Sequence, residues 1–256
     1  MDFECIIYEK EEDFAVIKLN RPKVLNAMNK QLWMDFQKAL DDAKNDPGIK
    51  ALIVTGEGRA FSTGADLKES KGRTIEAYRD YLVRLQETSR EIIRFEKPII
   101  AAINGYALGS GYELALACDI RIAAEDAQIG SPEAKVTSSV TGGAMRLLQD
   151  LVGPGKAREL LFTAEYISGK ESEKIGLVNK AVPLERLMDE AKDMARKIAK
   201  NSSFSLQIIK KGLNMARGEA SLDALMDYEV EGCLACVSTK ERQDSLKEFE
   251  ERKRTR

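Results

Sequence analysis

Three short apolar segments constrain the fold of this chain most strongly. Residues 51–55, 98–104 and 119–123 are mostly apolar, and a stretch with helical spacing lies in each interval between them. A strand that is apolar on both faces is typical of a parallel sheet whose two sides are covered by helices. The pattern therefore predicts an α/β fold.

The rest of the chain extends this core in both directions. Residues 5–19 predict an antiparallel pair of strands joined by a charged turn, and residues 29–45 have apolar side chains at helical spacing. From about residue 153 onward the pattern is mostly helical. We expect an α/β core over residues 1–190 and a helical C-terminal region over residues 191–256, whose apolar faces serve either core packing or assembly.

The absence of histidine from all 256 residues restricts the chemistry. It excludes Ser-His-Asp and Cys-His catalysis, histidine general bases and histidine metal ligands. Carboxylates, Lys, Tyr, Cys or backbone dipoles must then move protons near neutral pH. The balance of 40 basic against 42 acidic residues gives a net charge of −2 and provides no basic excess for nucleic acid.

The terminal sequence and the cysteines suggest a cytoplasmic protein without a metal. The first residues lack a basic segment followed by an apolar one, and no apolar run approaches the roughly 18 residues of a membrane span. Of the four cysteines, Cys5, Cys118, Cys233 and Cys236, the last two form a CxxC within a helical pattern. We expect inert helix thiols there, with redox or metal chemistry as the alternative.

Two glycine-containing turns, AFSTGADL over residues 60–67 and NGYALGSGYE over residues 104–113, each lead from an apolar segment toward a helix. Residues 57–64 are expected to form a loop. Two such junctions on neighbouring strands can direct two backbone N–H groups at one carbonyl oxygen and form an oxyanion hole. Turn geometry alone also explains the glycines, and GSG does not match the dinucleotide-binding pattern GxGxxG.

Two carboxylates accompany these turns. Glu113 lies in the first turn of the helix predicted after residue 109, and Glu133 follows Ser131 and Pro132. Taken alone, Glu113 is explained by its favourable interaction with the helix dipole, and Glu133 by an ordinary loop or helix start. Together, two carboxylates that hold one water between them can deliver its hydroxyl group and a proton to two carbons.

As an ordered set, several segments resemble the enoyl-CoA hydratase/isomerase, or crotonase, superfamily. They are LNRPKVLNAMN, AFSTGADLKE, PIIAAINGYALGSGYELALACDIRIAAEDAQIGSPE, GGAMRLLQDLVGPGKARELLFTAEYISGKESEKIGLVNKAV and DSLKEFEERKR, which together span nearly the whole chain. The resemblance implies a spiral of ββα units with a helical C-terminal trimerisation region. It also implies a homotrimer or a dimer of trimers.

The resemblance assigns roles to residues. It places the oxyanion hole at the N–H groups of Ala65 and Ser110, although the family often has glycine at the second position. Glu113 would deprotonate water, and Glu133 would give a proton to Cα. The implied substrate-binding residues are Lys23, Val24, Leu25, Ala65, Asp66, Leu67, Lys68 and Ser110. Lys253 is a further candidate for the CoA phosphates; a solvated surface position is the alternative.

One loop departs from the family pattern. Thr137, Ser138, Ser139 and Thr141 stand where the family often has small apolar residues and a proline. These hydroxyls either make the acyl pocket more polar or satisfy the loop backbone. The sequence therefore leaves open whether the natural substrate carries a branched, cyclic or oxygenated acyl group.

The implied activity is hydration of an enoyl-CoA, or the reverse dehydration, with CoA as part of the substrate and no further cofactor. Double-bond isomerisation, decarboxylation and thioester hydrolysis are the alternatives on this fold. A catalytically silent acyl-CoA-binding or RNA-associated scaffold is the third hypothesis; the near-neutral charge argues against RNA.

Overall fold

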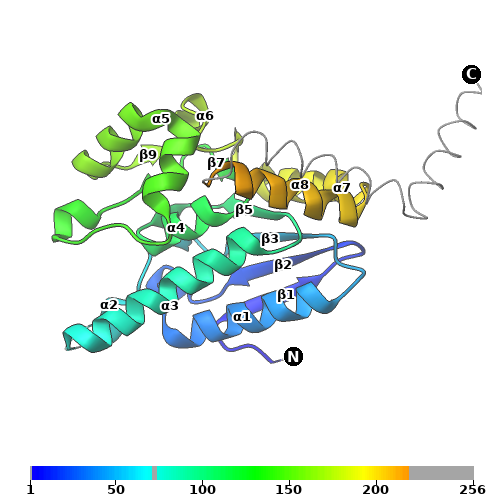
Figure 1. Cartoon of the computed structure of the whole chain (residues 1–256), viewed down its shortest axis with the longest axis horizontal. Helices are drawn as coiled ribbons and strands as arrows, with labels where there is room; N and C mark the ends of the chain where they lie inside the picture. The colour runs from blue at the N-terminus through cyan, green and yellow to red at the C-terminus, as the bar shows by residue number, and fades with distance from the viewer. Residues whose placement is uncertain (1, 71–73, 219–256) are drawn as a thin grey trace, which may run out of the picture.

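A computed structural model describes residues 2–70 and 74–218 and contains two β-sheets surrounded by helices (Figure 1). The larger sheet has the strand order β1-β2-β3-β5-β7-β10. Its strands are β1 (Ile6–Lys10), β2 (Phe14–Leu19), β3 (Ala51–Gly56), β5 (Ile99–Ile103), β7 (Ile120–Ala124) and β10 (Lys180–Val182). Only β1 and β2 pair antiparallel within it, which confirms both the predicted strand pair and the predicted parallel sheet.

A second sheet was not predicted. It has the order β4-β6-β8-β9, with β4 (Ala60–Ser62), β6 (Tyr106–Leu108), β8 (Gln128–Gly130) and β9 (Ile167–Ser168). The expected loop over residues 57–64 is therefore wrong, because it contains β4. Strands of two or three residues are too short to show a hydrophobic period, so the sequence carries no local signal for them.

The helices largely follow the predicted pattern. They are α1 (Lys30–Asn45), α2 (Leu67–Ser70), α3 (Ile75–Arg94), α4 (Ser110–Ala117), α5 (Ala144–Thr163), α6 (Gly169–Lys174), α7 (Leu187–Ala199) and α8 (Ser203–Ala216). Residues 2–70 and 74–218 also contain short 3-10 helices at η1 (Pro22–Val24), η2 (Glu133–Val136) and η3 (Leu184–Arg186). None of the described helices is both long enough and apolar enough to span a bilayer.

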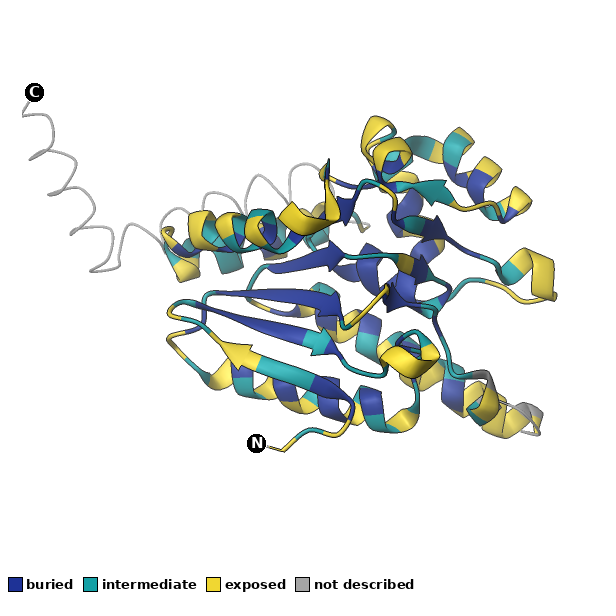
Figure 2. Ribbon diagram, turned by 180° about the vertical axis from the view of Figure 1, so that it is seen from behind, coloured by how far each residue is buried: buried dark blue, intermediate teal, exposed yellow. Residues whose placement is uncertain are grey.

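The larger sheet is covered on both faces, because alternate residues of its strands β2, β3 and β5 belong to different apolar clusters. Leu52 and Val54 of β3 pack in the cluster that includes α1 and α4, whereas Ala51 and Ile53 pack in the cluster with α7. Figure 2 shows the buried strands between helices whose outer surfaces are exposed. The predicted boundary at residue 190 lies within α7.

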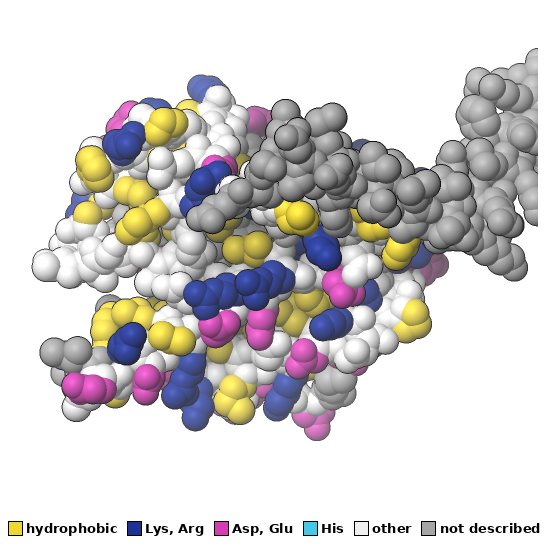
Figure 3. Space-filling model, viewed as in Figure 1, with side chains coloured by type: hydrophobic (Ala, Val, Ile, Leu, Met, Phe, Trp, Pro, Cys, Tyr) yellow, Lys and Arg dark blue, Asp and Glu magenta, His cyan; other side chains and the backbone are white. Residues whose placement is uncertain are grey.

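Basic and acidic side chains lie side by side on the face that carries α1 and α3 (Figure 3). This mixture fits the net charge of −2. The residues Cys233, Cys236 and Lys253 lie outside the described part of the chain.

Arg121 holds the end of α4 in place. Its side chain is 4% exposed. Its Nε donates to the carbonyl of Leu177 at 2.9 Å and its guanidinium also donates to the carbonyl of Cys118 at 2.6 Å. Arg121→Ala would leave these buried carbonyls without donors and is expected to reduce the free energy of unfolding by about 3 kcal/mol. Urea denaturation measures this loss.

Lys170→Ala is the matched control for Arg121→Ala. Lys170 forms an exposed ion pair with Glu125 at 2.7 Å, and such pairs contribute about 0.5 kcal/mol or less. Equal stability losses in the two variants would contradict the role of Arg121.

Candidate active site

The predicted site residues meet at one edge of the smaller sheet. Strands β4, β6 and β8 are parallel neighbours, so their carboxyl ends share an edge. The turn with Ala65 follows β4, Ser110 begins α4 shortly after β6, and Glu133 follows β8. Glu113 lies in the first turn of α4. The sheet that the sequence did not predict therefore brings the four proposed catalytic positions together.

The turns that carry Ala65 and Ser110 are in backbone contact. A Cβ atom at Gly64 would lie 2.9 Å from the nitrogen of Ser110 and 2.8 Å from the carbonyl oxygen of Leu108. Gly64 also has a φ of +94°, in the region that favours glycine. Only a residue without a side chain lets the two turns approach this closely.

Among the described residues, two backbone N–H groups at this contact have no hydrogen-bond acceptor. Ser110 is the first residue of α4, so its N–H has no acceptor within the helix. The N–H of Met28 donates to the carbonyl of Gly64 and that of Asp66 donates to the carbonyl of Met28, which leaves the N–H of Ala65 free. Within residues 2–70 and 74–218, neither Ala65 nor Ser110 donates a backbone hydrogen bond. Ala65 and Ser110 are the two positions predicted for the oxyanion hole, and that role stays a prediction.

Asn26 fixes the turn that carries Ala65. Its side chain is fully buried and donates to the carbonyl of Ala60 at 2.7 Å and to that of Glu57 at 3.0 Å. One residue earlier, the carbonyl of Leu25 accepts a hydrogen bond from the N–H of Thr63 at 3.1 Å. Leu25 and Asn26 are thus hydrogen-bonded to β4 and to the residue that follows it.

The predicted CoA-binding segments therefore lie next to each other. Lys23 and Val24 are exposed in η1, and Leu25 is half-buried. Lys68 is exposed in α2, shortly after the turn that carries Ala65. Their contact with CoA stays a prediction.

The carboxylate of Asp66 accepts hydrogen bonds from two other residues of the protein. It accepts hydrogen bonds from the guanidinium of Arg21 at 3.0 Å and from the N–H of Lys68 at 3.1 Å. Burial opposes ionisation, but these two donors outweigh it and hold the pKa of Asp66 below its usual value. The structure gives Asp66 a role in joining the segment before η1 to α2, whose first residue is Leu67.

Glu113 is buried and held at both carboxylate oxygens. Its side chain is 5% exposed. Oε1 accepts a hydrogen bond from the N–H of Thr141 at 2.5 Å, and Oε2 accepts one from the Thr141 hydroxyl at 2.7 Å. Burial raises the pKa of Glu113, the two bonds from Thr141 oppose this rise, and the charge of Glu133 adds to it. A carboxylate with a raised pKa is a stronger base near neutral pH.

Glu133 lies against the turn that precedes α4. It is half-buried and accepts a hydrogen bond from the hydroxyl of Ser131. A Cβ atom at Gly109 would lie 2.8 Å from Oε1 of Glu133, so this carboxylate touches the backbone next to Ser110. The two acids are close enough to interact electrostatically, since Glu133 influences the pKa of Glu113.

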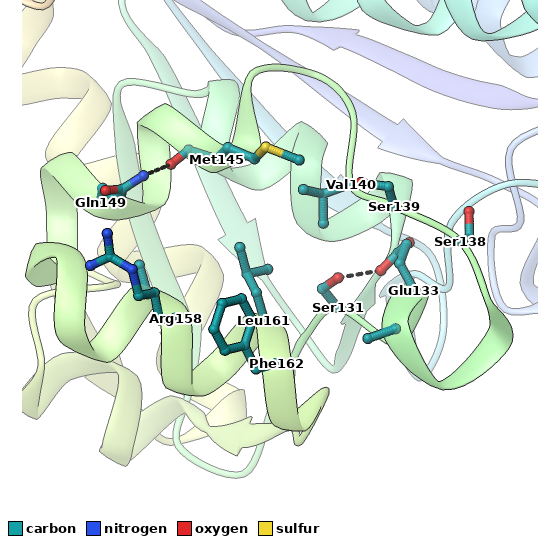
Figure 4. A pocket seen from close by; sticks show the side chains of 12 residues that line it. Ser131, Glu133, Ser138, Ser139, Val140, Met145, Gln149, Arg158, Leu161 and Phe162 are labelled. Atoms are coloured by element: carbon teal, nitrogen blue, oxygen red, sulfur yellow. Dashed lines mark hydrogen bonds between the residues drawn. The ribbon is translucent and has the colours of Figure 1, made fainter.

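An open cavity of about 320 Å³ adjoins Glu133 (Figure 4). Ser138 and Ser139 contribute polar groups to its lining, whereas Val140 and Met145 contribute apolar surface. Of the four hydroxyl residues noted in this loop, these two therefore line a cavity.

The other two loop hydroxyls have different positions. Thr137 is exposed and ends η2 with a φ of 55°. Thr141 binds Glu113. The sequence predicted Thr141 to line the pocket or to bind the loop backbone, and its contact with Glu113 was not predicted. No role was predicted for the hydroxyl of Ser131.

Known proteins resemble this chain over almost its full length. Residues 9–256 match the family model described as Enoyl-CoA hydratase/isomerase. A crotonyl-CoA hydratase of Syntrophomonas wolfei is 37% identical over 255 residues, which cover 99% of this chain and 98% of that protein. A short-chain-enoyl-CoA hydratase of Clostridium acetobutylicum is 36% identical, with 99% and 97% covered.

Solved structures show the same fold. An enoyl-CoA hydratase from Bacillus anthracis superimposes with a TM-score of 0.94 at 33% identity, and the match covers 97% of each chain.

Proposed function

The chain belongs to the enoyl-CoA hydratase/isomerase family, and we propose that it catalyses the reversible syn addition of water to the α,β double bond of an enoyl-CoA thioester. The observation that carries this proposal is the placement of two carboxylates, Glu113 and Glu133, around two unpaired backbone N–H groups. Isomerisation, decarboxylation and thioester hydrolysis on this fold need the N–H groups but not both acids in these roles.

In the proposed reaction, the thioester oxygen accepts hydrogen bonds from the N–H groups of Ala65 and Ser110. Glu113 removes a proton from a water molecule while the oxygen of that water bonds to Cβ. The electron pair of the double bond moves toward the thioester oxygen. Glu133 enters the turnover protonated, and when this enolate collapses, Cα takes that proton from Glu133. Glu113 has then gained a proton and Glu133 has lost one, so a proton must pass back before the next turnover.

The expected substrate is a short-chain enoyl-CoA. The relatives named crotonyl-CoA hydratase and short-chain-enoyl-CoA hydratase support this class. The hydroxyls of Ser138 and Ser139 in the cavity beside Glu133 support including oxygenated acyl groups among the candidates. We assign the CoA moiety to the adjacent segments with Lys23 and Lys68, and Lys253 is the candidate from the C-terminal region.

We also propose a cytoplasmic homotrimer or dimer of trimers that needs no cofactor beyond the CoA of its substrate. Ile209 and Leu213 of α8 are 57% and 63% exposed in the single chain, which supports a role of this helix in assembly. Light scattering coupled to gel filtration measures the mass, for which three or six times 28.5 kDa is expected.

The activity is tested by the loss of enoyl-thioester ultraviolet absorbance with a panel of short-chain, branched and oxygenated enoyl-CoAs. Rapid loss with at least one member is the expected result. If CoA thioesters bind but none is hydrated, the hydratase proposal is wrong and an isomerase-type reaction takes its place. If none binds, the acyl-CoA assignment itself is wrong.

A further inference from the structure

We propose that the hydroxyl group of Thr141 positions Glu113 and keeps one of its carboxylate oxygens hydrogen-bonded in both protonation states of the reaction. This inference rests on the proposed function. Thr141 acts through Glu113 and not on the substrate, so it is a positioning residue.

The contact is built by the segment before α5. Thr141 presents two groups to Glu113: its N–H lies 2.5 Å from Oε1, and its hydroxyl oxygen lies 2.7 Å from Oε2. Both carboxylate oxygens of Glu113 are therefore bound by one residue. Such a two-point contact fixes the orientation of the carboxylate as well as its position.

Gly142 brings Thr141 close enough to α4 for this contact. A Cβ atom at Gly142 would lie 3.3 Å from Cβ of Glu113 and 2.8 Å from the hydroxyl oxygen of Ser89 on α3. The φ of Gly142 is +61°, in the region that favours glycine. The segment thus passes tightly between α3 and α4 and carries Thr141 to the buried carboxylate.

The surroundings leave Glu113 dependent on these two donors. Among the described residues, Glu133 acts on the pKa of Glu113, because its carboxylate opposes ionisation of Glu113 whenever Glu133 is itself ionised. From α3, the uncharged hydroxyl of Ser89 lies beside Gly142, the residue after Thr141. Within the part of the chain that the structure describes, no cation lowers the pKa of Glu113, and the two hydrogen bonds from Thr141 stabilise its ionised form.

The two donors of Thr141 are not equivalent. A backbone N–H can only donate, so Oε1 is favoured to stay unprotonated. A hydroxyl can donate to an ionised carboxylate and, after rotation, accept from a protonated one. When Glu113 takes the proton of water, Oε2 can carry it and still keep Thr141 as its partner. The geometry therefore assigns the transferred proton to Oε2.

Thr141→Val tests the hydroxyl, since it removes that group and keeps the backbone N–H and the branched shape. We expect kcat to fall about 10-fold or more, while KM changes less than about twofold. A hydrogen bond to the ionised form is lost, so the pKa of Glu113 rises and the acid limb of the kcat profile moves up by about one pH unit. Steady-state hydration kinetics across pH measure both effects.

Two further variants separate this role from a structural one. Thr141→Ser keeps the hydroxyl and is expected to restore kcat to within about threefold and to return the acid limb. Thr163→Val removes an exposed hydroxyl that donates to the carbonyl of Glu159 in α5, and it is expected to behave as the wild type. If Thr141→Ser is as impaired as Thr141→Val, or if the acid limb stays in place in Thr141→Val, the proposal is overturned.

A titration without substrate separates this inference from the proposed function. Carboxyl ¹³C resonances of glutamate-labelled protein report the pKa of Glu113, which Glu113→Gln identifies. A higher pKa in Thr141→Val than in the wild type is expected, and equal values would overturn the inference. Absence of hydration by the wild type would instead refute the proposed function, and the titration would still test the contact.

Discussion

Glu113→Gln and Glu133→Gln are each expected to lower kcat for hydration at least about 100-fold. Glutamine keeps the volume of the side chain and much of its hydrogen bonding, but it neither removes a proton from water nor supplies one to Cα. Both acids act in the same turnover, so the double variant is expected to be little worse than either single variant. Ultraviolet assays at saturating enoyl-CoA measure these losses.

Binding of substrate should survive the same two substitutions. The N–H groups of Ala65 and Ser110 belong to the backbone, so the affinity for a CoA thioester is expected to change less than about fivefold. Glu159→Gln is the matched control, because Glu159 is an exposed acid of α5 that pairs with Lys156 at 2.8 Å. A Glu113→Gln or Glu133→Gln enzyme that retains more than about a tenth of the wild-type kcat would contradict the proposed two-carboxylate mechanism.

Gly64→Ala is expected to lower kcat about 100-fold, the effect of losing one oxyanion donor. The added Cβ would lie 2.9 Å from the nitrogen of Ser110 and 2.8 Å from the carbonyl oxygen of Leu108, so the two turns must separate. Glu113 and Glu133 are untouched by this change. The expected loss therefore arises from the geometry of the N–H groups of Ala65 and Ser110 and not from proton transfer.

Gly176→Ala controls for backbone strain in this experiment. Gly176 has a φ of +78°, similar to the +94° of Gly64, but the contact that its Cβ would make with the described residues is an ordinary one of 3.4 Å, to the carbonyl oxygen of Leu151. Both variants should lose stability in thermal denaturation, whereas kcat should collapse only in Gly64→Ala. A similar kcat in the two variants would show that the contact between Gly64 and Ser110 does not matter for the reaction.

The large sheet could be predicted from the sequence because its strands are apolar on both faces. Residues 51–55 and 98–104 fall on β3 and β5, and their alternate side chains pack on opposite layers of helices. The position of Glu113 in the first turn of a helix could also be predicted, since glycines mark the start of α4. Local patterns are sufficient where a whole strand or helix repeats the same environment.

The small sheet and the contact of Thr141 could not be predicted in the same way. Strand β4 has three residues, and it forms because Asn26 and the neighbouring β6 bind it from distant parts of the chain. Thr141 reaches Glu113 across 28 residues because Gly142 passes between α3 and α4. Both features depend on packing between segments and not on a local period.

The most direct test of the proposed reaction is mass spectrometry of the product formed from a short-chain enoyl-CoA in water enriched in ¹⁸O. Hydration assisted by Glu113 and Glu133 predicts a 3-hydroxyacyl-CoA that carries the ¹⁸O label at C3. An enoyl-CoA of unchanged mass with a moved double bond, or a labelled free acid with released CoA, would contradict it and show isomerisation or thioester hydrolysis instead.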